Sequence, residues 1–258
     1  MTDEASYVTS RDNALLKDLR KLAQDSHAYR RQGRIWLEGD HLCRAALQRG
    51  QRPSHAGFQS SWFDRVGHQW LATGGKVVVI DDALFDSISA LESPGRMGFV
   101  LPLPPAPQLQ ADAPTVILDG LQDAGNVGTI LRSAGAFGFR QVLAMKGTAA
   151  LWSPKVLRAG MGAHFGLDLL ESLDAEQLDA LKVPLLATSS HQGEFLHRAV
   201  LPWPCAWVLG HEGQGVSAAL ADRAAQFVRI VQPGGEESLN VGAAAAICLH
   251  ASAAAQAR

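Results

Sequence analysis

The chain has 258 residues, with 23 Lys and Arg against 25 Asp and Glu, so its formal net charge is −2. This length predicts two domains, each large enough to bury its own core, and the near-neutral charge excludes a uniformly basic nucleic-acid-binding protein. Three widely spaced cysteines exclude a disulfide framework, and no C-x-x-C or H-E-x-x-H motif indicates zinc, so we expect no metal.

The N-terminal segment carries a local excess of positive charge. From Arg11 to Arg34 there are seven Lys or Arg against three Asp. Leu16, Leu19 and Leu22 recur at helical spacing, so these charges could be only the solvated side of a helix, or they could contact a nucleic acid. The candidates for such contacts are Arg11, Lys17, Arg30 and Arg31. The first residues lack the basic start and apolar core of a secretory signal, which predicts a cytoplasmic protein.

Alternating patterns predict a small α/β domain over residues 1–103. Its predicted strands and helices follow the apolar runs and the helical periodicity, and they cover residues 34–38, 76–80 and 98–101 for the strands and 40–49 and 82–91 for the helices. Five of the twelve prolines fall between Leu101 and Pro114. This stretch predicts an extended linker, placed at residues 104–113, before a second domain over residues 114–258.

The second domain is predicted to be α/β with a mostly parallel sheet. Buried strands are expected at residues 115–119, 141–145, 183–188, 205–210 and 226–230, with a helix over 126–137 and an apolar helix over 241–255. The last of these is rich in alanine, which favours a buried helix over a membrane span. Polar, glycine-rich loops follow several strand ends, where open α/β sheets bind ligands. Neither a P-loop nor a G-x-G-x-x-G motif is present, which disfavours the common nucleotide sites.

The polar residues of these loops each have a purely structural explanation. Asn126 and Asn240 could cap helices, Ser238 could do the same, and Glu212 could be a charge at a helix start. Arg132 could be an ordinary surface arginine. The alternative is that the first turn of the last helix lies in a ligand pocket, where free backbone donors and small side chains let a ligand approach.

Three motifs resemble those of the SpoU (TrmH) family of RNA ribose 2′-O-methyltransferases. They are N-x-G-x-x-x-R at residues 126–132, L-G-x-E-G-x-G at 209–215 and S-L-N-V at 238–241. The stretch SPKVLRAGMGA at 153–163 is similar to a further family segment, and the first domain resembles the ribosomal-protein-like domain of members that act on ribosomal RNA. The resemblance implies a SPOUT fold with a deep trefoil knot, S-adenosylmethionine as cofactor, RNA as substrate and a homodimer joined through the C-terminal helix.

The resemblance also implies roles for individual residues. Arg132 matches the arginine that engages the target phosphate, and Glu212 matches an acid that orients Arg132 or Asn126 or favours the cationic cofactor, with general base as the less favoured role. Asn126, Ser238 and Asn240 would order the catalytic loop. The residues expected to bind the cofactor are Leu209, Gly210, Gly213, Ile230, Ser238, Leu239 and Asn240.

The sequence departs from the family pattern in two places. Many members have Pro-Met where this chain has Val231-Gln232, and many have Ser where it has Gly242.

Methylation of 23S ribosomal RNA is the leading interpretation. The alternatives are a transfer-RNA ribose methyltransferase, a non-catalytic RNA-binding assembly factor on the same fold, and an α/β enzyme that uses another nucleotide.

Overall fold

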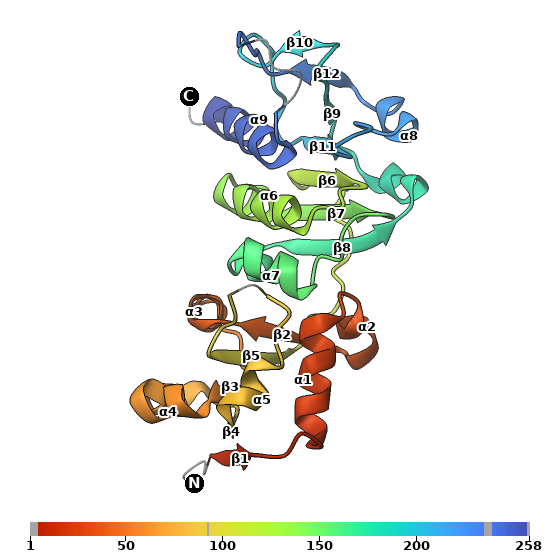
Figure 1. Cartoon of the computed structure of the whole chain (residues 1–258). Coiled ribbons are helices and arrows are strands. Elements are labelled where there is room, and N and C mark those ends of the chain that lie inside the picture. Colours follow the sequence, from red (N-terminus) through yellow and green to blue (C-terminus); the bar gives the residue numbers. More distant parts are fainter. Residues whose placement is uncertain (1–4, 92, 235–238, 257–258) are drawn as a thin grey trace. The chain divides into compact units, whose positions relative to one another are not determined.

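The computed structural model describes residues 5–91, 93–234 and 239–256 (Figure 1). The chain divides into two compact units, of which the first contains residues 1–105 and 152–165 and the second contains residues 106–151 and 166–258. The segment 152–165 therefore groups with the first unit, although the sequence-based division assigned it to the second domain. In the described parts of the chain, no helix combines the length and apolarity that crossing a membrane requires.

The first unit is built on a mixed sheet with the strand order β1-β4-β3-β5-β2. β5 runs antiparallel to both its neighbours, whereas β1, β4 and β3 are parallel. The predicted strands at 34–38 and 76–80 match β2 and β4, and the sequence missed β3. The strands are β1 (Ser6–Val8), β2 (Arg34–Glu38), β3 (His55–Gln59), β4 (Lys76–Ile80) and β5 (Met97–Pro102).

Helices of the first unit bury one side against this sheet. In α1 the buried leucines Leu16, Leu19 and Leu22 share a core with Trp36 and Phe85, so the predicted amphipathic helix is confirmed. The helices are α1 (Ala14–Gln24), α2 (Ala28–Gln32), α3 (Asp40–Gln48), α4 (Ser60–Val66), α5 (Asp82–Asp86) and α7 (Pro154–Gly160), with short 3-10 turns η1 (Gly67–Thr73) and η2 (Ala163–Gly166).

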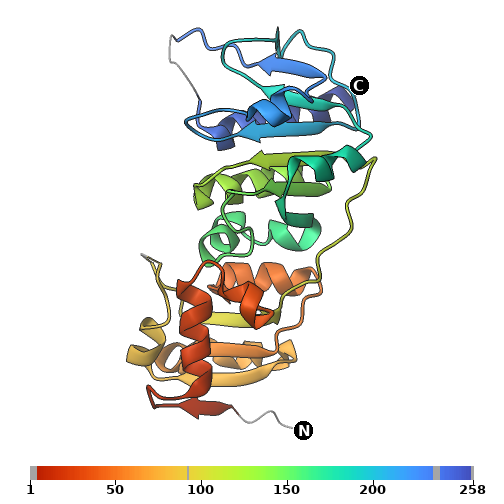
Figure 2. The same cartoon turned by 90° about the vertical axis from the view of Figure 1, so that its right-hand side faces the viewer.

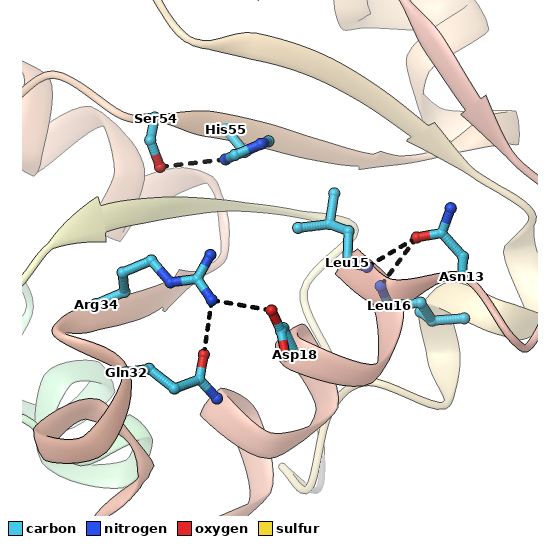
Figure 3. A network of polar contacts seen from close by, with 8 residues as sticks. All are labelled: Asn13, Leu15, Leu16, Asp18, Gln32, Arg34, Ser54 and His55. Atoms are coloured by element: carbon cyan, nitrogen blue, oxygen red, sulfur yellow. Dashed lines mark hydrogen bonds and ion pairs between the residues drawn. The ribbon is translucent and has the colours of Figure 1, made fainter.

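Two local contacts fix the position of α1. The Asn13 side chain accepts hydrogen bonds from the backbone N–H groups of Leu15 (2.9 Å) and Leu16 (3.3 Å), which caps the helix N-terminus (Figure 3). Arg34, at the start of β2, donates to Asp18 and to Gln32, each at 3.0 Å (Figure 3). One guanidinium thus joins the middle of α1 to the end of α2.

The second predicted helix of this unit, over 82–91, is shorter in the structure. α5 ends at Asp86, and the Ile88 N–H bonds to the Phe85 carbonyl in a tighter turn. Ile88 is nevertheless buried in the core. The apolar periodicity beyond Asp86 therefore reflects burial of a turn and not a continuing helix.

The second unit contains a parallel sheet with the strand order β10-β12-β9-β11-β6-β7-β8, which confirms the predicted α/β class. Predicted strands match β6 and β7; β9 and β11 begin two residues and one residue later than predicted, and β12 ends one residue earlier. The sequence missed β8, an edge strand in which polar residues interrupt the apolar run. The strands are β6 (Thr115–Asp119), β7 (Gln141–Met145), β8 (Asp168–Leu173), β9 (Leu185–Thr188), β10 (Glu194–Phe195), β11 (Ala206–Gly210) and β12 (Gln226–Arg229).

Helices cover both faces of this sheet, as the two views in Figures 1 and 2 show. α6 (Ala124–Ala136) and α9 (Val241–Gln256) pack side by side on one face, and α8 (Ala218–Ala221) and η3 (Ala175–Ala180) lie on the other. Ile117 and Val208 share a core with Leu178 and Leu220 on the second face. Both faces are buried, which explains why these strands read as continuous apolar runs.

A buried hydrogen bond ties α9 to the sheet. The Trp207 indole N–H in β11 donates to the Ser252 hydroxyl at 2.9 Å, and both residues are buried. We expect Ser252→Ala to lower the free energy of unfolding by about 1–3 kcal/mol, because it leaves a buried donor without an acceptor. Urea unfolding measures this loss. Ser133→Ala, at a partly exposed serine of α6, is the control, and equal losses in both variants would contradict the expectation.

Candidate functional site

A cavity of about 940 Å³ opens in the second unit where β9, β11 and β12 end. Its walls come from the ends of these strands and the segments that follow them, at residues 188–192, 210–216, 230 and 232, and from residues 239–241 at the start of α9. The volume suits a ligand of nucleoside size, which commonly fills cavities of ~300–1,000 Å³. Of the three loops predicted to converge at the carboxyl edge of the sheet, those after β11 and β12 line the cavity, and the loop after β6 does not.

The structure brings most predicted pocket residues together. Those that line the cavity are Gly210, Glu212, Gly213, Ile230, Leu239 and Asn240. Leu209 is fully buried within β11 and does not belong to the lining, and Ser238 lies outside the described residues. Asn126 and Arg132 lie on α6 and are not part of the lining, but Asn126 is hydrogen-bonded to the lining residues Glu212 and Asn240.

A chain of hydrogen bonds joins the three sequence motifs. The Asn126 side-chain amide donates to the Glu212 carboxylate at 3.2 Å, and the Asn126 carbonyl oxygen accepts from the Asn240 side-chain amide at 2.9 Å. The Asn240 side-chain oxygen in turn accepts from the backbone N–H groups of Gly242 (2.9 Å) and Ala243 (3.2 Å). Asn240 therefore caps α9 and also holds the Asn126 side chain. The same residue serves as a helix cap and lines the cavity, so both interpretations of its motif apply.

The position of Glu212 follows from the order of the strands. β11 and β6 are neighbours in the sheet. The strand that follows β6 in the chain, β7, lies on one side of this pair, and the strand that follows β11, β12, lies on the other side, which makes this a topological switch point. The Glu212 carboxylate, after β11, lies 3.5 Å from the Gln122 backbone nitrogen and 3.4 Å from that of Asp123, both after β6. The Glu212 carboxylate thus links the loop after β11 to the loop after β6.

These hydrogen bonds keep Glu212 ionised. Burial pushes the pKa of its carboxyl group upward, but hydrogen bonds from its own backbone, from Asn126 and from the amides of Gln122 and Asp123 outweigh burial and lower the pKa from its ordinary value of 4.5. A carboxylate with a lowered pKa is a weak base at neutral pH. The geometry therefore favours an orienting role for Glu212 over proton abstraction.

The lowered pKa predicts how stability depends on pH. The stabilisation from ionised Glu212 is fully present above 4.5 and is lost as the pH falls through the lower pKa of the folded state. We expect wild-type protein to melt at a higher temperature than Glu212→Gln at pH 7, with a difference that shrinks toward pH 4. Melting temperatures of both proteins across this range measure the effect. A difference independent of pH would contradict it.

Backbone geometry explains the glycines around Glu212. The loop closes through two backbone hydrogen bonds between His211 and Gly215, of 3.0 and 2.8 Å, and Gly215 has a φ of +72°. A Cβ atom on Gly210 would lie 2.2 Å from the Gly215 carbonyl carbon and from the Val216 nitrogen. Only glycine at position 210 lets the strand pass this closely beneath its own loop.

Sequence reasoning missed one wall of the cavity. Residues 188–192, which follow β9, all line it, and the Ser189 hydroxyl accepts from the N–H groups of His191 (3.1 Å) and Gln192 (3.2 Å). The available signal was the polar stretch Thr-Ser-Ser directly after a buried apolar strand.

The two departures from the family pattern both touch the site. The Gln232 side-chain oxygen is buried at the cavity without a hydrogen-bond partner in the described part of the chain, so a donor on a bound ligand would satisfy it. A Cβ on Gly242 would lie 3.1 Å from the Asn240 side-chain oxygen and 3.4 Å from the Thr129 methyl carbon. Glycine at 242 thus gives room to the Asn240 cap.

The predicted RNA-contacting cations are all at the surface. Arg132 is exposed on α6, and Arg11 is exposed before α1. Lys17 pairs with Asp12 at 3.0 Å and Arg31 pairs with Asp25, while Arg30 donates to the Tyr29 hydroxyl at 2.9 Å. Exposed ion pairs are weak, at ~0–1 kcal/mol, so RNA phosphates can replace these partners. Within residues 5–91, 93–234 and 239–256, no group of three or more His, Cys, Asp or Glu is placed to hold a metal ion.

Comparison with known proteins identifies the family. The model of the SpoU rRNA methylase family matches residues 113–250, more than half of the chain, and the protein belongs to this family. A 23S rRNA (guanosine-2′-O)-methyltransferase from Bacillus subtilis is 28% identical, with 94% of this chain and 97% of that protein covered.

Solved structures agree with this assignment. The crystal structure of an RNA 2′-O ribose methyltransferase superposes with a TM-score of 0.82 and 29% identity, with 98% of this chain and 100% of that chain covered. An S-adenosylmethionine-bound rRNA methyltransferase from Sinorhizobium meliloti gives a TM-score of 0.80 and 26% identity, with 96% and 97% covered.

Proposed function

We propose that this protein transfers a methyl group from S-adenosylmethionine to a ribose 2′-hydroxyl of RNA, with 23S ribosomal RNA as the substrate. The observation that carries the proposal is the cavity of about 940 Å³ whose lining residues Glu212 and Asn240 are joined through hydrogen bonds to Asn126. Family membership supplies the reaction class. The name of the Bacillus subtilis relative, which matches over nearly the whole chain, supports ribosomal over transfer RNA.

The donor groups of the cavity fit this cofactor. Apolar side chains of Val228, Ile230 and Leu239 line it beside polar backbone at Gly210 and Gly213, as an adenosine requires. S-adenosylmethionine supplies a methyl group on a positively charged sulfur. The ionised Glu212 carboxylate at the cavity favours that positive charge and holds Asn126 in place.

Arg132 is proposed to position the RNA. A guanidinium stays protonated in proteins, so Arg132 holds the target phosphate through paired N–H groups and stabilises the negative charge that develops on the 2′-oxygen. A phosphate oxygen or a water molecule then accepts the hydroxyl proton. Ser238 is proposed to complete the cofactor loop beside Asn240.

The chain topology and assembly follow from the same family relationship. We propose that the C-terminal segment passes through a loop to form a trefoil knot, and that two copies of the chain associate through α9. Ile247, at 41% exposure, and small alanine side chains lie on the uncovered side of this helix, which suits close packing against a second copy. Residues 1–103 are proposed to be the RNA substrate-binding domain.

The N-terminal cations provide a separate test of RNA binding. We expect the double charge reversal Arg30→Glu and Arg31→Glu to weaken RNA binding and to lower its salt dependence, because phosphate contacts release counterions. Cofactor affinity should not change. Titration of RNA at several salt concentrations measures the slope, and Arg49→Glu, at another exposed arginine, is the control. If the dependence of RNA affinity on salt concentration did not change, Arg30 and Arg31 would be part of a solvated helix face that does not contact RNA.

The decisive experiment is transfer of labelled methyl from S-adenosylmethionine to total RNA from a strain that lacks this protein. The RNA is separated by size and digested to nucleosides. Label recovered as a 2′-O-methylnucleoside in the large ribosomal RNA is the expected result. Label in transfer RNA would show that the substrate is transfer RNA and not ribosomal RNA. Tight RNA binding without label would show that the protein is an RNA-binding assembly factor and not an enzyme.

A further inference from the structure

An aromatic and cationic cluster lies at the outer edge of the sheet in the second unit. β10 pairs only with β12 and is the last strand on that side (Figure 1). The register of the two strands places Phe195 directly opposite Arg229. We call Phe195, His197 and Arg229 the β10 platform.

The three side chains of the platform stack on one another. The Arg229 guanidinium carbon lies 4.2 Å from the centre of the Phe195 ring, and the His197 ring lies at 5.8 Å from that ring with an angle of 27° between the planes. His197 is exposed, and Phe195 and Arg229 are half-buried. The platform therefore presents the exposed His197 ring to solvent, beside a phenylalanine that is stacked with a guanidinium.

Backbone contacts hold this surface in place. The Leu196 N–H donates to the Arg229 carbonyl at 2.7 Å, and the Arg229 Nε donates to the Gly193 carbonyl at 3.0 Å. The N–H groups of Arg198 and Ala199 both donate to the Phe195 carbonyl, at 2.8 and 3.0 Å. A ligand would thus meet a preformed surface and would lose little free energy by ordering it.

The platform adjoins the cavity through both of its strands. His191 and Gln192, directly before β10, line the cavity, and so do Ile230 and Gln232, directly after Arg229. The platform residues are therefore chain neighbours of cavity-lining residues on both strands. The carboxylates of the described ion pairs do not include a partner for Arg229, so its charge is available to a phosphate.

We propose that the β10 platform binds an unpaired nucleotide next to the target ribose, with its base stacked on His197 and its phosphate near Arg229 and the exposed Arg198. This inference rests on the proposed RNA substrate. Single-stranded RNA is recognised by stacking of splayed bases on aromatic rings and guanidinium planes, whereas bases inside a duplex cannot reach such a surface. The platform thereby selects locally unpaired RNA and sets which nucleotide faces the cavity.

The test compares His197→Ala and Arg229→Gln with the wild type. The control is Arg140→Gln, at an exposed arginine directly before β7, which lies next to the edge strand β8 on the other side of the same sheet. The probes are a short, labelled, random-sequence single-stranded RNA and a blunt RNA duplex. We expect both platform variants to bind the single strand about tenfold more weakly, as loss of one stacked base implies, with unchanged duplex binding and unchanged S-adenosylmethionine affinity.

The outcomes separate this inference from the proposed function. Unchanged affinity for the single strand in both variants, with methylation by the wild type, would overturn the platform alone. A wild type that binds RNA without methylating it would overturn the proposed reaction, and the affinities would still decide the platform. An altered sedimentation mass with unchanged RNA affinity would assign the platform to contacts between copies and would also overturn it.

Discussion

Replacing Gly210 by alanine is expected to weaken S-adenosylmethionine binding by at least about tenfold. The added Cβ would lie 2.2 Å from backbone atoms of Gly215 and Val216, and backbone cannot move aside as a flexible side chain can. Relief of such overpacking costs ~1–3 kcal/mol and must open the loop that carries Glu212. Isothermal titration with S-adenosylmethionine measures the loss.

The neighbouring glycine provides a matched control. A Cβ on Gly213 would meet only the His211 ring, at 3.8 Å, which is an ordinary contact distance. Gly213→Ala adds the same methyl group to the same cavity-lining loop without a backbone clash, so it should lower cofactor affinity less than Gly210→Ala does. If both variants lost the same cofactor affinity, the cause would be a general clash between added methyl groups and the cofactor. The close approach of Gly210 to Gly215 and Val216 would then not be the cause.

Replacing Arg132 by alanine is expected to lower the rate of methyl transfer by about 10²–10³, the usual effect of removing a group that stabilises a developing oxyanion. Arg132 is exposed on α6, so its loss creates no cavity, and both the melting temperature and the cofactor affinity should remain those of the wild type. Single-turnover methyl transfer with saturating RNA measures the rate.

A conservative variant separates charge from geometry at this position. Arg132→Lys keeps the positive charge but loses the planar pair of N–H groups that holds a phosphate, so it should recover only a small part of the activity. Full activity in the lysine variant would mean that charge alone suffices. Wild-type turnover in the alanine variant would remove Arg132 from the mechanism.

Local patterns in the sequence were sufficient for the secondary structure that surrounds the site. β6 and β7 match the predicted ranges, and α9 begins at Val241 beside its Asn240 cap. These features depend on neighbours within one or two helical turns or on continuous apolar runs, which a linear pattern contains. The predictions failed at two places where the apolar pattern did not follow the secondary structure. β8 was missed because polar residues interrupt its apolar run, and the helix predicted beyond Asp86 is a buried turn.

The sequence by itself determined an α/β protein with polar, glycine-rich loops at strand ends, and the motif resemblance determined its family. Only the tertiary structure decided how those loops meet. The Asn126 side chain contacts Glu212 and Asn240 across 86 and 114 residues, and the β10 platform depends on the pairing of β10 with β12. Strand order and register bring such residues together, and both arise from packing of the whole sheet, which no local pattern contains.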